Sequence, residues 1–199
     1  TQGYWYLDKA PQGEIKRILT DSRHAESGDA FLALKGERFD AHDFIVQVAT
    51  NGCQVAIVSH PVDADICQLV VKDTRLALGY LGAYRRAKNS QLKVIALTGS
   101  SGKTTTKEML GSILSRLAPT LITRGNLNND LGVPMMLLEL RSEHQYAVME
   151  LGASHQGEID YTSNLVQPHV AGILNIGTAH LGEFGGRDGI CRAKSEIYA

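Results

Sequence analysis

The sequence has 199 residues, with 20 basic and 21 acidic side chains and a formal net charge of −1 at pH 7. A near-neutral chain without a run of Lys or Arg lacks the positive surface that nucleic-acid binding requires, so we expect no nucleic-acid partner. No basic-then-apolar segment at the start of the sequence resembles a signal peptide, and no apolar stretch approaches the roughly 20 residues that span a bilayer. We therefore expect a soluble, cytoplasmic monomer that does not bind membranes.

The three cysteines lie at positions 53, 67 and 191, without a Cys-x-x-Cys pair or a histidine at metal-binding spacing. We expect reduced thiols rather than a disulfide framework. The chain begins at Thr1, without a methionine, and stops at Ala199 within a segment that has a helical pattern. We therefore expect a truncated piece of a longer protein.

The first region, residues 1–88, predicts a small α/β domain. Apolar runs at 31–34, 55–58 and 68–71 are typical of buried strands, and residues 44–50 have helical spacing. Two polar loops interrupt this pattern. The loop at 20–23 is either an anion-binding loop or a plain capping turn, and the loop at 35–42 could face it.

The second region, residues 89–199, begins after a helix that Asp73 can cap and that runs to Lys88. Apolar runs at 94–97, 119–123, 146–149 and 170–176 predict strands, and they alternate with helical patterns. Such alternation indicates a parallel sheet with right-handed crossovers. Ligands of these sheets bind at the carboxyl ends of the strands, where the glycines at 99 and 102, Glu150 and His180 emerge.

A Gly-rich phosphate loop follows the first strand of this region and leads into a helix predicted over 109–117. Glycines let successive backbone N–H groups face one anion, the helix N-terminus adds partial positive charge, and Lys103 adds a full charge. Thr104 stands where a hydroxyl would hold Mg²⁺. The predicted ATP-binding residues are Gly99, Ser100, Ser101, Gly102, Lys103, Thr104 and Thr105.

Three further residues are candidates for the same site. Glu150 ends an apolar strand and could provide an oxygen ligand for Mg²⁺, although a solvent-facing glutamate would give the same pattern. His180 follows the last strand and is either a ligand or an ordinary surface histidine. The pattern around Lys194 is typical of a lysine on a helix surface. A lysine that loses its proton near a metal can instead form a carbamate with CO₂.

Several blocks of the sequence together resemble the ATP-dependent Mur ligases. The phosphate loop, Glu150, His180 and Lys194 carry the likeness to the family as a whole. Residues 125–129 and 150–159 are most similar to the branch that adds a D-alanyl-D-alanine dipeptide. The blocks are residues 20–23, 28–31, 36–42, 98–105, 125–129, 150–153, 157–159, 179–181 and 193–197.

The resemblance implies an amide-bond ligase of peptidoglycan precursor synthesis that uses ATP and Mg²⁺. The carboxylate of UDP-N-acetylmuramoyl-tripeptide would be phosphorylated to an acyl phosphate, which the amine of D-alanyl-D-alanine would then attack. Lys103, Glu150, His180 and Lys194 would be catalytic. Thr104 and Glu150 would hold one Mg²⁺, and His180 with a carbamylated Lys194 would help to hold a second.

The resemblance also implies a UDP-substrate site in the first domain, to which one asparagine of the 126–129 loop would be added. The family has a third domain that this sequence lacks, so we expect binding without ligation. Lys194 lies near the chain end, and we expect a frayed, unmodified lysine there. The candidate UDP-site residues are Ser22, Arg23, Lys35, Arg38, Asp40, His42, Asn126 and Asn129.

Other classes of protein remain as alternatives. Another Mur ligase or a folylpolyglutamate synthase would share the phosphate loop, the acid and the histidine. A nucleotide-binding module that does not ligate would use the same loop, but it would give Lys194 and residues 20–23 no role.

Overall fold

The computed structural model describes residues 3–37, 39–177, 182 and 184–199. Its internal contacts divide the chain into two compact units, Thr1–Tyr80 and Leu81–Ala199. The division falls within helix α2 (Thr74–Lys88), whereas the sequence pattern placed it at the end of this helix. The Asp73 carboxylate accepts hydrogen bonds from the backbone N–H groups of Arg75 and Leu76, as a capping residue should.

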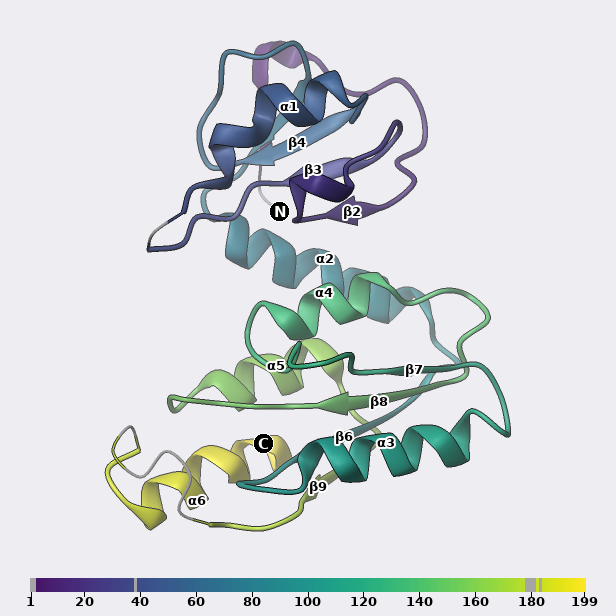
Figure 1. The fold of residues 1–199 in the computed structure, drawn as a ribbon, viewed down its shortest axis with the longest axis vertical. Coiled ribbons are helices and arrows are strands. Elements are labelled where there is room, and N and C mark those ends of the chain that lie inside the picture. Colours follow the sequence, from purple (N-terminus) through teal and green to yellow (C-terminus); the bar gives the residue numbers. More distant parts are fainter. Residues whose placement is uncertain (1–2, 38, 178–181, 183) are drawn as a thin grey trace. The chain divides into compact units, whose positions relative to one another are not determined.

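The first unit is built on a five-stranded sheet with the order β1-β5-β4-β3-β2, of which β4, β3 and β2 are labelled in Figure 1. Strand β1 is antiparallel to β5, and the other neighbours are parallel. The sequence did not predict β1 and β2, because two residues are too few to show an alternating pattern. The strands are β1 (Tyr4–Trp5), β2 (Ile18–Leu19), β3 (Ala30–Leu32), β4 (Val55–Val58) and β5 (Cys67–Val70).

Helix α1 (Ile45–Thr50) covers one face of this sheet and buries Ile45 and Val48 against Phe31 and Val58. Spacing of three residues puts Ile45 and Val48 on the same helix face, which explains why α1 packs this way. Short 3-10 helices at Tyr6–Asp8, Ser22–His24 and Ala41–Phe44 make the connections.

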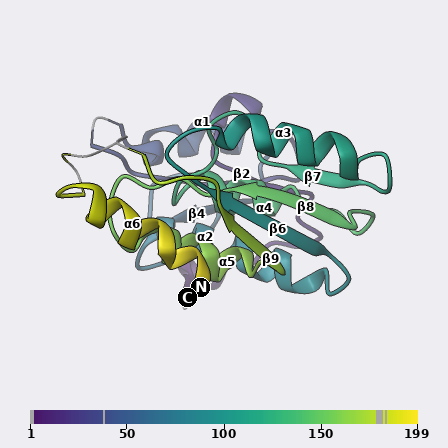
Figure 2. The ribbon, with the colours of Figure 1, turned by 90° about the horizontal axis from the view of Figure 1, so that it is seen from below.

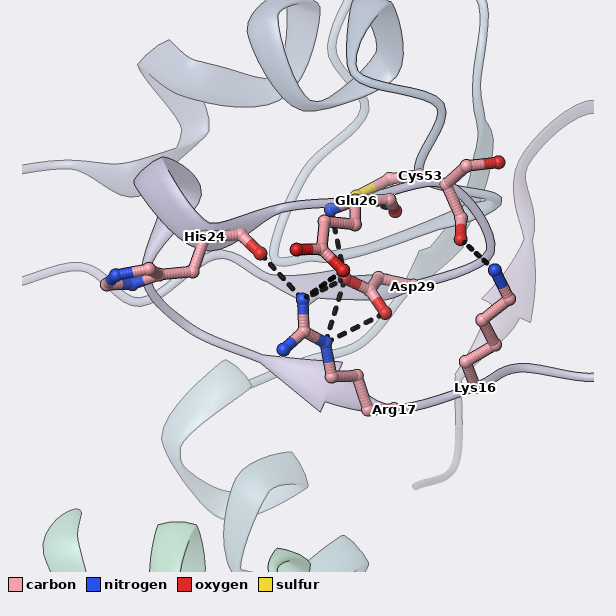
Figure 3. A network of polar contacts seen from close by, with 7 residues as sticks. Lys16, Arg17, His24, Glu26, Asp29 and Cys53 are labelled. Carbon is pink, nitrogen blue, oxygen red and sulfur yellow. Dashed lines mark hydrogen bonds and ion pairs between the residues drawn. The ribbon is translucent and has the colours of Figure 1, made fainter.

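An ion pair between Arg17 and Asp29, which no sequence pattern predicted, stabilises the edge of the first sheet (Figure 3). The Arg17 Nε donates to both oxygens of Asp29 at 3.0 Å, and its Nη2 donates to the His24 carbonyl at 2.8 Å. Asp29 is buried, and the Glu26 N–H also donates to its carboxylate. The hydrogen bond to Asp29 raises the pKa of Arg17, so the pair is charged. Because Arg17 directly precedes β2 and Asp29 directly precedes β3, the pair connects the starts of these two strands.

The second unit contains the predicted parallel sheet, with the strand order β7-β8-β6-β9. All its strand pairs are parallel, which confirms the α/β class expected from alternating strands and helices. The strands are β6 (Lys93–Thr98), β7 (Thr120–Ile122), β8 (Tyr146–Glu150) and β9 (Val170–Ile173).

Helices cover both faces of this second sheet (Figure 2). Helix α3 (Lys103–Leu114) lies on one face, while α5 (Glu158–Val166) and α6 (Arg187–Ser195) lie on the other. Helix α4 (Gly132–Leu138) shares an apolar core with α5 and the sheet. This core contains Val94, Met149, Met136 and Ile159, all almost completely buried. No helix in the described part of the chain is both long enough and apolar enough to cross a membrane.

Candidate functional site

The turn between β6 and α3 forms a phosphate loop at the carboxyl edge of the second sheet. Gly102 has a φ of +77°, a left-handed conformation that favours glycine. A Cβ added to Gly99 would lie 3.1 Å from the Leu174 Cβ, so this position also favours glycine. Helix α3 begins at Lys103, directly after the loop, whereas the sequence pattern predicted it only from Met109. The exposed side chains of the first turn hid its helical periodicity.

Lys103 lies at the first turn of α3, where the helix presents unpaired N–H groups. Its Nζ donates to the Gly99 carbonyl at 2.8 Å, so the side chain folds back over the loop. No side chain in the described part of the chain caps this helix end. The free N–H groups, the helix dipole and the ammonium group together form a site suited to a phosphate.

Glu150 is the last residue of β8 and faces this loop. It is 2 % exposed, so the alternative of a solvent-facing glutamate is wrong. One carboxylate oxygen accepts a hydrogen bond from the Thr104 hydroxyl at 3.3 Å. The other accepts from the Asn128 side-chain amide at 2.7 Å. The sheet therefore brings together the acid and the hydroxyl that the sequence pattern paired.

Asn128 is the asparagine of the 126–129 loop that contacts Glu150, whereas the sequence pattern did not distinguish it from Asn126 and Asn129. Asn129 instead caps α4, since its side-chain oxygen accepts a hydrogen bond from the Gly132 N–H at 2.8 Å. Asn126 is exposed. Because the three asparagines are alike in residue type, only the path of the loop could show which one reaches Glu150.

Behind Glu150, two buried residues hold the strand end in place. The Thr123 hydroxyl oxygen accepts a hydrogen bond from the Glu150 N–H at 2.9 Å. The buried Lys107 Nζ donates to the Thr123 carbonyl at 2.7 Å and also pairs with Glu108. No sequence pattern singles out Lys107, because its position in the helix is typical of a surface lysine.

Lys194 is buried, with 4 % of its surface exposed, so the expectation of a frayed, mobile lysine is wrong. Burial lowers its pKa, and the nearby Lys103 charge lowers it further. Both effects favour the neutral amine. The expectation failed because it considered the helix end alone and left out how this helix packs against the rest of the second unit.

After Lys194 the chain continues as a 3-10 helix (Glu196–Tyr198), and Glu196 and Tyr198 bind this segment to the rest of the second unit. The Glu196 carboxylate accepts hydrogen bonds from the N–H groups of Gly157 and Asp160, and so caps α5. The Tyr198 hydroxyl accepts from the Ile173 N–H at 3.2 Å.

Magnesium is the metal that this donor set suits, because Mg²⁺ binds hard oxygen ligands and takes the rest from phosphates and water. Glu150 and Thr104 provide two such oxygens. No cluster of three His, Cys, Asp or Glu side chains occurs in the described ranges, and an Mg²⁺–nucleotide site does not need one. The predicted ligand His180 lies outside the described residues.

The predicted UDP-site residues of the first unit follow β2 and β3, which are parallel neighbours, so the two loops lie at the same edge of the sheet. At residues 20–23 the structure has a capping turn: the Asp21 carboxylate accepts from the Arg23 N–H and pairs with its guanidinium. Arg23 itself is exposed, and Ser22 lies in the same turn. Hydrogen bonds from Arg23 lower the pKa of Asp21.

The second loop is closed by its own charged groups. Lys35 pairs with Asp40 at 3.4 Å, and the His42 Nδ1 lies 2.6 Å from the same carboxylate. Backbone and side-chain hydrogen bonds from His42 lower the pKa of Asp40 to about 2. The buried His42 Nε2 accepts from the Ser59 N–H at 2.9 Å, so both ring nitrogens bind within the chain. Arg38 lies outside the described residues, and Asn126 and Asn129 belong to the second unit.

Family profiles match both parts of the chain. Residues 14–97 match "Mur ligase family, catalytic domain", and residues 97–199 match "Mur ligase middle domain". The chain therefore belongs to the Mur ligase family.

Particular members of the family are very similar to it. A crystal structure of MurF from Acinetobacter baumannii is 88% identical with a TM-score of 0.97, covering 100% of this chain and 44% of that chain. The UDP-N-acetylmuramoyl-tripeptide–D-alanyl-D-alanine ligase of Escherichia coli is 53% identical over 93% of this chain and 41% of its own length. MurF from Thermotoga maritima, solved in complex with ADP, is 37% identical with a TM-score of 0.84, covering 92% of this chain and 43% of its own. The chain thus spans less than half the length of these relatives.

Proposed function

We propose that the second unit binds ATP with Mg²⁺ in the site formed by the phosphate loop, Thr104 and Glu150. The observation that carries this proposal is the hydrogen bond between Thr104 and Glu150, which puts two hard oxygen ligands beside a loop built for phosphates. The ADP complex of the similar T. maritima protein supports it.

In this site, some residues would bind the phosphates and others would hold the metal ligand in position. Lys103 and the N–H groups of the first α3 turn would bind the phosphates, and Lys103 would exchange its bond to Gly99 for one to a phosphate oxygen. Asn128 would hold the Glu150 carboxylate in orientation. Bound Mg²⁺ would neutralise phosphate charge as the phosphoryl group is transferred.

Lys194 and His180 would complete the site, by the family resemblance. The structure supports this for Lys194, because burial and Lys103 favour the neutral amine that reacts with CO₂. A carbamate at Lys194 would replace a cation with an oxygen ligand for a second Mg²⁺. An ordinary helix-surface lysine would be exposed instead.

For the first unit we propose binding of the UDP end of UDP-N-acetylmuramoyl-tripeptide at the edge that carries residues 20–23 and 35–42. In the whole protein, the tripeptide carboxylate would be phosphorylated and D-alanyl-D-alanine would then displace the phosphate. The similarity to the A. baumannii and E. coli ligases supports this substrate over those of other Mur ligases or of folylpolyglutamate synthase.

Calorimetry with ADP and Mg²⁺ tests the nucleotide site directly on this chain. Ligation is tested in a hybrid protein in which this chain replaces the matching segment of the A. baumannii MurF. The hybrid should release phosphate only when UDP-N-acetylmuramoyl-tripeptide and D-alanyl-D-alanine are both present. Phosphate release without the two substrates would favour a nucleotide-binding module instead, and activity with glutamate and a folate would favour a folylpolyglutamate synthase.

A further inference from the structure

Strand β9 continues beyond its last ladder pair as a partner of the phosphate loop. The ladder between β6 and β9 ends at Thr98 and Ile173. Beyond it, the Leu174 N–H donates to the Thr98 carbonyl at 2.9 Å, and the Ser100 N–H donates to the Asn175 carbonyl at 3.2 Å. The loop is therefore held along one side by the backbone that follows β9.

The Asn175 side chain extends this pairing with three hydrogen bonds to Ser101. Its Oδ1 accepts from the Ser101 N–H at 3.1 Å and from the Ser101 hydroxyl at 3.3 Å. Its Nδ2 donates to the Ser101 carbonyl at 3.0 Å. One amide group thus binds the peptide groups on both sides of Ser101, which fixes the backbone just before the left-handed Gly102.

Only a side chain with a donor and an acceptor next to each other can make this contact. Asparagine offers an amide oxygen and an NH₂ group, whereas aspartate offers acceptors alone and alanine offers neither. Asn175 is exposed and does not belong to the apolar cores. Its contacts with the loop therefore account for the residue type better than a role in packing does.

We propose that Asn175 is a positioning residue for phosphate binding, a role that rests on the nucleotide site proposed above. By fixing Ser101, it sets the direction in which the N–H groups of Gly102, Lys103 and Thr104 point before the ligand arrives. The Ser101 N–H is then committed to Asn175, so the phosphate is bound by the N–H groups that follow it. A loop that is already ordered binds the phosphate more tightly, because no conformational entropy of the loop is lost on binding.

The test measures ADP binding in the presence of Mg²⁺ for the wild-type chain and two variants. Asn175→Ala removes all three side-chain hydrogen bonds to Ser101 and should weaken ADP binding about tenfold or more. Asn175→Asp keeps the acceptor for Ser101 but adds a negative charge beside the phosphate site. It should bind more weakly than Asn175→Ala at about 50 mM salt and approach it at about 500 mM, since salt screens the repulsion.

Two further measurements separate positioning from a general loss of stability. Amide hydrogen exchange at Ser101 should speed up in Asn175→Ala, while the thermal midpoint without nucleotide stays within a few degrees of wild type. Asn164→Ala is the matched control, because Asn164 is an exposed asparagine whose bonds stay within α5. It should leave ADP binding unchanged.

Each outcome is decisive. If Asn175→Ala binds ADP within about twofold of wild type, the positioning role is wrong although the nucleotide site stands. If the wild-type chain does not bind ADP, the proposed function fails and the positioning role fails with it. If Asn175→Ala is too unstable to measure, the near-isosteric Asn175→Asp decides, and ADP binding equal to wild type at low salt would overturn the proposal.

Discussion

The Thr104 hydroxyl donates a hydrogen bond to the Glu150 carboxylate at 3.3 Å, across 46 residues of sequence. Thr104 lies in the first turn of α3 and Glu150 at the end of β8, so the parallel pairing of β6 with β8 brings the two together. A hydroxyl and a carboxylate in this relationship can share one Mg²⁺.

Lys103→Ala should weaken ADP binding and strongly slow phosphate release in the hybrid protein. Losing a charge aimed at the phosphates should lower kcat by about 100-fold or more if electrostatic stabilisation carries the step. Calorimetry and a phosphate-release assay measure the two effects. Lys93→Ala is the control, because Lys93 is exposed at the opposite end of β6 and should leave both unchanged. A normal kcat in Lys103→Ala would contradict the role of the loop.

Asn128→Ala should raise the Mg²⁺ concentration needed for half-maximal ADP binding by about tenfold, as loss of a residue that orients a metal ligand does elsewhere. The reason is that Glu150 loses the amide that holds one of its oxygens at 2.7 Å. A Mg²⁺ titration at fixed ADP measures the shift. Asn126→Ala is the matched control, since Asn126 is exposed in the same loop. Equal shifts in the two variants would mean that the loop as a whole is responsible.

Lys194→Met should stabilise the chain at neutral pH in the absence of Mg²⁺ and bicarbonate. Because burial lowers the pKa of Lys194 below 10.5, the unfolded state binds more protons than the folded state between the two pKa values. Stability contributed by this group therefore rises with pH in that window, and its cost is largest below the folded-state pKa. The thermal midpoint of the variant should exceed that of wild type at about pH 7, and the difference should shrink toward about pH 10.

The same Lys194→Met change should lower ligase activity in the hybrid protein, so stability and activity would move in opposite directions. Lys194→Ala leaves room for an added short-chain carboxylate, which should restore part of the activity by taking the place of the carbamate. Wild-type activity in Lys194→Ala without any added carboxylate would mean that the lysine is structural.

Arg17→Met should destabilise the first unit more than Asp29→Asn does. The Asp29 side chain is 2% exposed and the Arg17 side chain 48%, so removing Arg17 leaves a buried carboxylate unpaired, whereas removing the charge of Asp29 leaves an arginine that water can reach. We expect losses of about 2 and about 1 kcal/mol. Urea unfolding followed by hydrogen exchange in β2 and β3 measures them.

A control for this ion pair is Arg141→Met, since Arg141 and Glu143 form an exposed pair at 3.7 Å. This variant should change the free energy of unfolding by less than about 0.5 kcal/mol. Equal losses for Arg17→Met and Asp29→Asn would show that burial of Asp29 does not set the cost.

The sequence by itself determined the parallel sheet of the second unit and the phosphate loop at its edge. Apolar runs and glycines are local signals, because a strand and a tight turn each impose requirements on a few consecutive residues. The match between β4 and the predicted strand 55–58, and the position of Glu150 at the end of β8, follow from such runs. The likeness to the Mur ligases added the expected roles of the residues.

Only the tertiary structure decided which of several chemically equal residues reach the site. It selected Asn128 over its neighbours, buried Lys194 at a helix end that the local pattern left free, and joined Asn175 to the phosphate loop. The Arg17–Asp29 pair and the cap that Glu196 provides for α5 are of the same kind. Each depends on groups far apart in the chain, and a side chain's burial and hydrogen bonds are set by whatever the fold brings against it, which no local pattern records.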